Sequence, residues 1–286
     1  MELSISFTNI DSYLEWKIGD NLLARFEHHQ DILNKWSPRP NSSTEVSGWC
    51  DVCASESFFL LDDLYSDKSQ IPWQPNWRER LVCQGCLLNA RMRASFSLTT
   101  PLFESKSKIW ISEQTTPYYR TLATKYENLI GSEYFGAKYK SGEILENGMR
   151  NEDCTDTSFD TETLDGVLSF DVMEHFPQYE TAIKETFRIL RHGGVFFWTA
   201  PFDINKEKTS VRANLLANGT IEYLMDPIMH GDPINPSEGI LCFQIFGWDI
   251  LESMRNAGFS EVKVVLFWSK SHVILGDPLP FFIARK

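Results

Sequence analysis

Residues 161–202 read "TETLDGVLSFDVMEHFPQYETAIKETFRILRHGGVFFWTAPF". Two apolar runs, 165–170 and 195–202, flank a segment at 179–192 that has a helical pattern. Short apolar strands that alternate with helices predict a parallel sheet covered by helices. The glycine pair at 193–194 predicts the cap of this helix, because a left-handed residue commonly ends a helix. The stretch therefore indicates an α/β fold with a strand–helix–strand unit at its centre.

The same alternation continues on both sides of this unit. Further strands are expected at 108–112, 128–135, 148–153, 261–268 and 280–286. Further helices are expected at 116–126 and 248–259, and the second should end at Gly258. Together these elements predict a seven-stranded, mostly parallel sheet with helices on both faces.

The chain divides into three parts by composition. Residues 1–44 hold one expected helix, over 13–36, and the linker "SPRPNSST" at 37–44. Residues 45–105 carry two cysteine pairs, and residues 106–286 form the expected α/β domain.

Bulk composition limits the classes of function. The 286 residues are 42% apolar and 13% aromatic, which is enough for a packed core. A formal net charge of -12 argues against a broad phosphate-binding surface, so nucleic acid is not an expected partner. Neither a signal peptide nor a membrane span is evident in the sequence, which favours a cytoplasmic, reducing location without disulfides. The oligomeric state does not follow from the sequence.

The two cysteine pairs have the spacing of a metal site. Cys50 and Cys53 form one CxxC motif, and Cys83 and Cys86 form a second one 29 residues later. A tetrahedral Zn²⁺ takes four thiolates at about 2.3 Å, and two such motifs supply them. The sequence predicts a structural zinc site here and ordinary buried thiols at Cys154 and Cys242.

Acidic residues follow the expected strands. Ligands of open parallel sheets bind at the carboxyl ends of the strands, where an acid after the second strand holds ribose hydroxyls. Glu133 lies twenty residues after Glu113, Asp153 follows the expected third strand, and Asp171 ends the fourth. This pattern predicts a nucleoside-containing cofactor at that edge.

The motifs "LDGVLSFDVMEH" and "RILRHGG" resemble the class I S-adenosylmethionine-dependent methyltransferases of type 11. The resemblance covers 108–286 and implies a Rossmann-like fold and methyl transfer from S-adenosylmethionine. The cofactor residues that it implies are Glu113, Thr115, Glu133, Tyr134, Asp153, Cys154, Phe170 and Asp171. The cysteine module with "GSEYF" and "MHGDPINPSEGIL" resembles bacterial methyltransferases associated with glycan modification, which implies a polar, saccharide acceptor that is methylated on oxygen.

The first turn departs from this family. "SEQTTPYY" (112–119) has no glycine, whereas the family places a glycine-rich turn there. Glu113 could still accept a hydrogen bond from the methionine ammonium group, and Thr115 or Thr116 could cap the next helix with Pro117 in its first turn. The alternative is a methyltransferase fold that has lost activity and serves as a binding protein.

Two histidines are the candidate general bases, because imidazole changes charge near neutral pH. His175 follows the fourth strand, and His230 lies in a polar loop after the fifth. Two other interpretations concern the same turn. Asp171 and Glu174 could form a capping box, or Asp171, Glu174 and His175 could hold a divalent cation such as Mg²⁺.

The acceptor side is predicted from the remaining polar residues. Its candidates are Arg91, Arg93, Tyr223 and Asp232. For the two arginines, ion pairs with the acidic surface are an equal alternative. A zinc-ribbon RNA methyltransferase is the second functional class, and the net charge speaks against it.

Overall fold

The structure is a computed structural model that describes residues 2–19, 28–29, 31–35, 41–66, 75–232, 234–235 and 237–286. Its contacts divide the chain into two compact units. Unit 1 consists of Met1–Phe7, Asp11–Leu102 and Val265–Phe281, and unit 2 of Thr8–Ile10, Phe103–Val264 and Phe282–Lys286. The C-terminal segment Val265–Phe281 therefore groups with the cysteine pairs, although the sequence pattern assigned it to the α/β domain.

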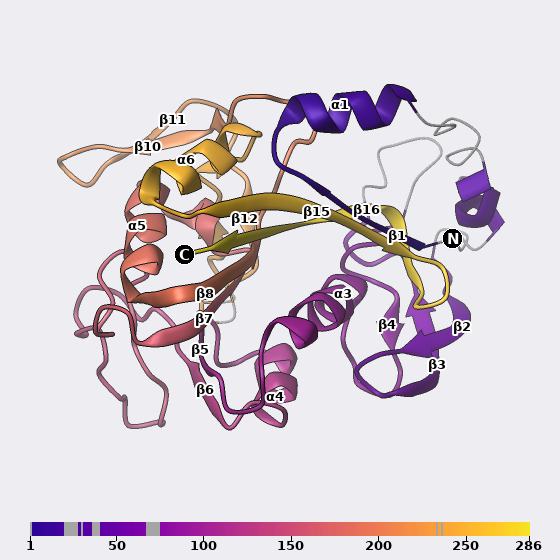
Figure 1. Ribbon diagram of the computed structural model, residues 1–286, viewed down its shortest axis with the longest axis horizontal. Coiled ribbons are helices and arrows are strands. Elements are labelled where there is room, and N and C mark those ends of the chain that lie inside the picture. The colour runs from indigo at the N-terminus through magenta and orange to yellow at the C-terminus, as the bar shows by residue number, and fades with distance from the viewer. Residues whose placement is uncertain are drawn as a thin grey trace. The chain divides into compact units, whose positions relative to one another are not determined.

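Four parallel strands form the centre of unit 2 (Figure 1). They are β5 (Lys108–Ile111), β6 (Asn128–Gly131), β7 (Leu164–Phe170) and β8 (Leu190–Thr199). β5 lies between β6 and β7, and β8 pairs with the other side of β7. Their side chains are mostly buried, as expected for strands covered on both faces. Because all four run in one direction, their carboxyl ends lie at the same edge of the sheet.

Three further strands complete the sheet in the order β1-β15-β16-β8-β7-β5-β6. These are β1 (Glu2–Phe7), β15 (Glu261–Ser269) and β16 (Ile274–Arg285), and β16 is antiparallel to β8. The number seven was predicted, but the strands differ from those expected. The expected third strand at 148–153 is wrong, because the residues there form only isolated bridges: Asn151 is parallel to Glu133, and Arg150 and Asp153 form antiparallel bridges. β1, which no pattern indicated, takes the seventh place.

Helices lie on opposite sides of the parallel strands, with α4 (Pro117–Ala123) on one side and α5 (Tyr179–Ile189) on the other (Figure 1). α6 (Asp249–Ala257) ends at Gly258, which has a φ of 116° and confirms the predicted left-handed cap. The cap predicted at 193–194 is wrong. α5 ends at Ile189, Leu190 is already extended, and Gly193 lies within β8 where its register with β7 shifts.

In its described residues, the long connection from β8 to α6 contains short antiparallel strand pairs. They are β10 (Ala213–Leu215) with β11 (Ile221–Tyr223), β12 (Met229–His230) with β13 (Ile240–Leu241), and β14 (Gln244–Ile245) with β9 (Ser210–Val211). The β12–β13 pair places His230 opposite Ile240 and Met229 opposite Leu241.

Unit 1 is built on a three-stranded antiparallel sheet of β2 (Thr44–Cys50), β3 (Ser55–Leu61) and β4 (Val82–Cys83). Its helices are α1 (Ile10–Gly19), which begins in unit 2, and α3 (Ala90–Thr99), which is followed by the 3-10 turn η1 (Thr100–Leu102). Asn89 caps α3 by accepting a 2.8 Å hydrogen bond from the amide of Met92. The expected helix at 13–36 is seen over 10–19, 28–29 and 31–35, and residues 20–27, 30 and 36–40, which include part of the linker, lie outside the described residues. In the described part of the chain, no helix has the length and apolar character needed to cross a bilayer.

Candidate active site and metal centres

The first turn of unit 2, residues 112–116, needs no glycine. None of these five residues has a positive φ, so an L side chain fits at each position without strain. Thr116 caps α4 by accepting a 3.1 Å hydrogen bond from the amide of Tyr119, and Pro117 follows in the first turn. The predicted cap is confirmed at Thr116. The glycine-free sequence is therefore compatible with an ordered strand–turn–helix.

Glu133 fixes the same turn from the neighbouring strand end. Its Oε1 accepts hydrogen bonds from the amides of Gln114 (2.7 Å) and Thr115 (2.9 Å) and from the Thr115 hydroxyl (2.8 Å). Amides that a glycine-rich turn would point at a ligand are thus directed at a carboxylate of the protein. Within the described residues, every hydrogen bond that the Glu133 side chain accepts reaches Oε1, and none reaches Oε2.

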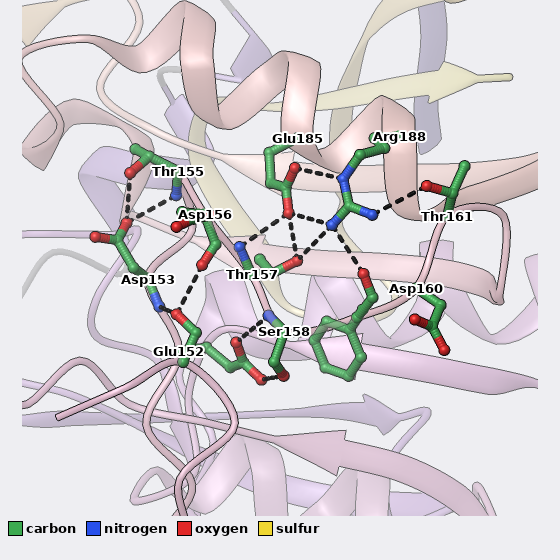
Figure 2. Close-up of polar contacts among 12 residues, drawn as sticks. Glu152, Asp153, Thr155, Asp156, Thr157, Ser158, Asp160, Thr161, Glu185 and Arg188 are labelled. Atoms are coloured by element: carbon green, nitrogen blue, oxygen red, sulfur yellow. Dashed lines mark hydrogen bonds and ion pairs between the residues drawn. The ribbon is translucent and has the colours of Figure 1, made fainter.

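The segment after Glu133 brings the next predicted cofactor residues to the same place. The amide of Glu152 donates a 3.0 Å hydrogen bond to the carbonyl of Glu133, and this pairing places Tyr134 near Asp153. Burial and the charge of Asp153 raise the pKa of Tyr134. Asp153 uses Oδ1 for the amide and hydroxyl of Thr155 (Figure 2). Cys154 is half-buried beside it, and burial raises the pKa of its thiol.

A network of polar contacts holds this segment against α5 (Figure 2). Buried Glu152 accepts from the amide and hydroxyl of Ser158, and Glu185 of α5 accepts from the amide and hydroxyl of Thr157. Arg188 pairs with Glu185 at 2.6 Å. These contacts take the place of the regular strand that the sequence predicted here.

Asp171 has a left-handed backbone conformation, whereas no residue of the first turn (112–116) has one. Its φ is 54°, which aspartate tolerates better than most residues, and such conformations occur often at functional sites. Its Oδ1 accepts a 3.0 Å hydrogen bond from the Thr199 hydroxyl, and its amide donates to the Thr199 carbonyl. The capping box predicted for Asp171 and Glu174 is wrong, because the 3-10 turn η2 (Met173–His175) begins after Val172 without a side-chain cap. Phe170, one residue earlier, is buried against Tyr118.

Both candidate bases lie next to one buried carboxylate. Glu174 has a fully buried side chain, and its Oε1 is 3.3 Å from His230 Nδ1 and 3.6 Å from His175 Nε2. The two imidazole rings meet edge to face with centroids 5.1 Å apart. The sequence predicted each histidine separately, and the structure brings them together around Glu174.

The η2 turn is held by residues 241–244. His175 Nδ1 lies 2.8 Å from the carbonyl oxygen of Leu241, and since a carbonyl only accepts, Nδ1 carries the proton. The amide of Phe243 donates to the Glu174 carbonyl, and Gln244 Nε2 donates to the carbonyls of Met173 and Phe176. Nε2 of His175 is therefore the nitrogen that faces Glu174. No local signal in the sequence indicated this pairing.

Comparison with known proteins identifies the central part of unit 2. Residues 118–198, less than a third of the chain, match a family described as a methyltransferase domain. The chain carries a methyltransferase domain. This match supports the S-adenosylmethionine-dependent methyltransferase that the sequence motifs predicted.

Solved structures similar to this chain include three S-adenosylmethionine-dependent methyltransferases. The protein from Mesorhizobium loti is 12% identical, with 67% of this chain and 98% of that chain covered and a TM-score of 0.42. The Archaeoglobus fulgidus protein is 14% identical, with 68% and 92% covered and a TM-score of 0.42. The Methanosarcina mazei protein is 12% identical, with 66% and 96% covered and a TM-score of 0.41. Scores this low carry no conclusion about function, and no curated protein matches the sequence.

The four paired cysteines meet in unit 1. Cys50 Sγ lies 3.8 Å from Cys86 Sγ, Cys53 Sγ lies 3.8 Å from Cys83 Sγ, and all four sulfurs lie within 4.8 Å of one another. Four thiolates at about 2.3 Å from a tetrahedral ion are separated by about 3.8 Å, so the geometry fits Zn²⁺. A hydrogen bond from Cys86 lowers the pKa of Cys50 to about 5.

The two cysteine motifs have the same backbone turn. The residue after each motif, Ala54 or Leu87, has a positive φ (49° and 62°), which closes each loop around its sulfur atoms. Gly85 is required for a different reason, because a Cβ atom there would lie 2.9 Å from Cys53 Sγ. Cys242, which the sequence placed among ordinary thiols, is buried away from this group in unit 2, and burial raises its pKa to about 11.

The four tentative acceptor residues have different surroundings. Arg93 is buried in unit 1, where it donates to the carbonyls of Leu81, His272 and Val273 and covers the Phe59 ring. Arg91 forms an ion pair with Glu79 at 2.9 Å. Arg91 thus forms the ion pair that was the alternative to acceptor binding, and Arg93 has a structural role. Neither arginine is part of the site proposed below. Tyr223 is exposed on β11. Asp232, two residues after His230, accepts a 2.8 Å hydrogen bond from the amide of Ile234.

Proposed function

We propose that this protein is an S-adenosylmethionine-dependent methyltransferase that methylates a hydroxyl oxygen of a saccharide acceptor. The methyltransferase-domain match at 118–198 carries the proposal. The acids at the carboxyl ends of β5, β6 and β7 support it, because they surround the place where open parallel sheets bind nucleosides.

The cofactor would be held mainly by carboxylates. Oε2 of Glu133 suits a ribose hydroxyl, and the charged group of Glu113 suits the methionine ammonium. Asp153, whose Oδ1 is used by Thr155, could accept from the adenine amino group through its other oxygen. The amides of residues 114 and 115 donate to Glu133 and so cannot donate to a ligand. This weakens cofactor binding less for S-adenosylmethionine than for a dinucleotide, because S-adenosylmethionine has no pyrophosphate to accept from them.

The imidazoles support a hydroxyl acceptor. Bound S-adenosylmethionine supplies an electrophilic methyl group, and a hydroxyl must lose its proton when it attacks. His230 is one-third exposed and lies beside buried Glu174, so it can be reached by an acceptor while its ring is oriented by the carboxylate. Tyr223 and Asp232, from the same connection between β8 and α6, would contact the acceptor.

The four cysteines would hold a structural Zn²⁺. Four thiolates leave no position for a water molecule or substrate, so this ion would stabilise unit 1 without entering the chemistry. Free thiolate ligands also fit the cytoplasmic location that the sequence favours.

Calorimetry and a transfer assay test the proposal. We expect S-adenosylhomocysteine to bind with a measurable heat, and a labelled methyl group to pass from S-adenosylmethionine to saccharides with free hydroxyls. Binding without transfer to any saccharide would contradict the acceptor class only. An absence of heat at millimolar cofactor would contradict the enzyme and favour a binding protein with a methyltransferase fold.

A further inference from the structure

Glu174 is a buried carboxyl group for which the described residues supply no hydrogen-bond donor. Its side chain has no exposed surface, and neither oxygen accepts a hydrogen bond from the described residues. Removing a carboxylate from water without compensation costs several kcal/mol, so such groups are paired with a cation or bound to a metal. Two imidazoles, those of His175 and His230, lie beside Glu174, and the Cys242 thiol is also close enough for the charge of Glu174 to raise its pKa.

The distances fit ligands of a shared ion better than direct hydrogen bonds. Hydrogen bonds from a charged N–H to a carboxylate are about 2.7–2.9 Å long, whereas Oε1 of Glu174 lies 3.3 Å and 3.6 Å from the two imidazole nitrogens. Nitrogen and oxygen ligands at about 2.0–2.1 Å from a tetrahedral ion lie roughly 3.3–3.4 Å apart. The three ligand atoms lie within 4.8 Å of one another.

His175 has the tautomer expected of a metal ligand. Its Nδ1–H is used by the Leu241 carbonyl, which leaves the lone pair of Nε2 directed to the Glu174 side. Ligating histidines commonly donate their other N–H to a carbonyl or carboxylate, and this contact fixes the ring.

We infer that Glu174, His175 and His230 bind a divalent transition-metal ion. One carboxylate and two imidazoles form the three-ligand set of metal sites that keep an open position. Imidazole ligands favour zinc, cobalt, nickel or iron over magnesium. This site differs from the predicted one in two respects. His230 replaces Asp171 as the third ligand, because Asp171 is held by Thr199. The expected metal is a transition-metal ion instead of Mg²⁺.

The open position would face the acceptor. His230 is the exposed member of the three, with 31% of its side chain accessible against 6% for His175. A hydroxyl that reached the ion there would be more acidic, and its proton would pass to solvent, because the Nδ1 lone pair of His230 would be used by the ion. This role rests on the proposed function, but binding of the ion does not.

Cobalt loading tests the site because the two metal centres differ in colour. We expect metal-free protein to bind two equivalents of Co²⁺, one with the thiolate charge-transfer absorption of the cysteine site and one without it. His230→Ala and Glu174→Gln should lose the second equivalent, with an affinity at least about 100-fold lower, and retain the thiolate band. Cys83→Ser should lose the thiolate band and retain the other equivalent.

A matched control uses a histidine outside the cluster. His192 is 87% exposed and 3.5 Å from a glutamate, so His192→Ala should change neither equivalent. The inference is overturned if wild-type protein binds only thiolate-ligated Co²⁺, or if His230→Ala keeps the second equivalent. Calorimetry with S-adenosylhomocysteine on the same samples separates this outcome from a failure of the proposed function, because it detects cofactor binding without the ion.

Discussion

At the scale of single residues, Glu133 links the glycine-free turn to the cofactor site. Replacing it by alanine removes three hydrogen bonds to residues 114 and 115 and the carboxylate oxygen offered to ribose. We expect Glu133→Ala to weaken S-adenosylhomocysteine binding by about 1–3 kcal/mol in calorimetry. The exposed Glu127, immediately before the first residue of β6, is the matched control, and Glu127→Ala should bind normally. Equal affinity of both variants and wild type would show that Glu133 does not contact the cofactor.

Glu113, Glu133, Asp171 and His175 could be selected from the sequence because each follows an apolar run that forms a strand. Their partners could not be selected in this way. Glu174 meets His230 because β12 pairs with β13 and Leu241 binds His175, and more than fifty residues of chain separate Glu174 from His230. Arg93 illustrates the same limit, since nothing local indicates that its guanidinium is buried under three carbonyl groups.

At the scale of elements, α5 holds the segment that replaces the expected third strand. Burial alone would raise the pKa of Glu185, but hydrogen bonds from Arg188 and Thr157 outweigh it and the pKa lies below its ordinary value of 4.5. A carboxyl group whose pKa is lower in the folded protein stabilises the fold at any pH above its pKa in the unfolded chain. This stabilisation is lost as the pH falls through the pKa of the group in the folded protein.

We therefore expect Glu185→Gln to lower the free energy of unfolding by about 1 kcal/mol at pH 7. The difference from wild type should shrink as the pH falls below 4.5. Urea unfolding at a series of pH values measures this difference. A constant difference from pH 7 to pH 3 would mean that the charge of Glu185 does not stabilise the fold.

The end of α6 permits a comparison of two glycines. Gly258 and Gly219 both have positive φ (116° and 82°), but a Cβ atom at 258 would lie 2.6 Å from the Phe187 ring, whereas nothing lies within 4 Å at 219. Gly219→Ala should cost about 1 kcal/mol of unfolding free energy for backbone strain. Gly258→Ala should cost about 1–3 kcal/mol more for overpacking. Thermal unfolding measures both, and equal losses would contradict the contact with Phe187.

Element boundaries show where sequence patterns are sufficient. Gly258 was correctly predicted as a cap because the helix pattern and the glycine end together. The pair at 193–194 has the same appearance, yet the helix ends four residues earlier and Gly193 serves an irregular part of β8. Only the pairing of β8 with β7 distinguishes the two cases. β1 could not be predicted for a similar reason, because an edge strand depends on a neighbour from the far end of the chain.

At the scale of the whole molecule, the cysteine segment is bound to a distant part of the chain. Within unit 1, the Trp49 amide donates to the Ser271 carbonyl at 2.9 Å, and His272 lies 3.2 Å from Asp51, which is inside the first CxxC motif. Arg93 donates to the carbonyls of residues 272 and 273. The proposed zinc ion should therefore stabilise residues 265–281 as well as residues 45–102.

Loss of the zinc ion should thus destabilise unit 1 in both parts of the sequence. In hydrogen exchange, we expect Cys83→Ser, or wild type treated with a strong chelator, to lose amide protection at 44–61 and 90–99 and also at 265–275. The parallel strands at 164–170 and 195–199 should keep their protection, because their hydrogen bonds lie within unit 2. Cys154→Ser is the matched thiol control and should exchange like wild type, since Cys154 lies in unit 2 outside the four-cysteine group. If 44–61 lost protection while 265–275 kept it, the two segments would fold independently and the division of the chain into these units would be wrong.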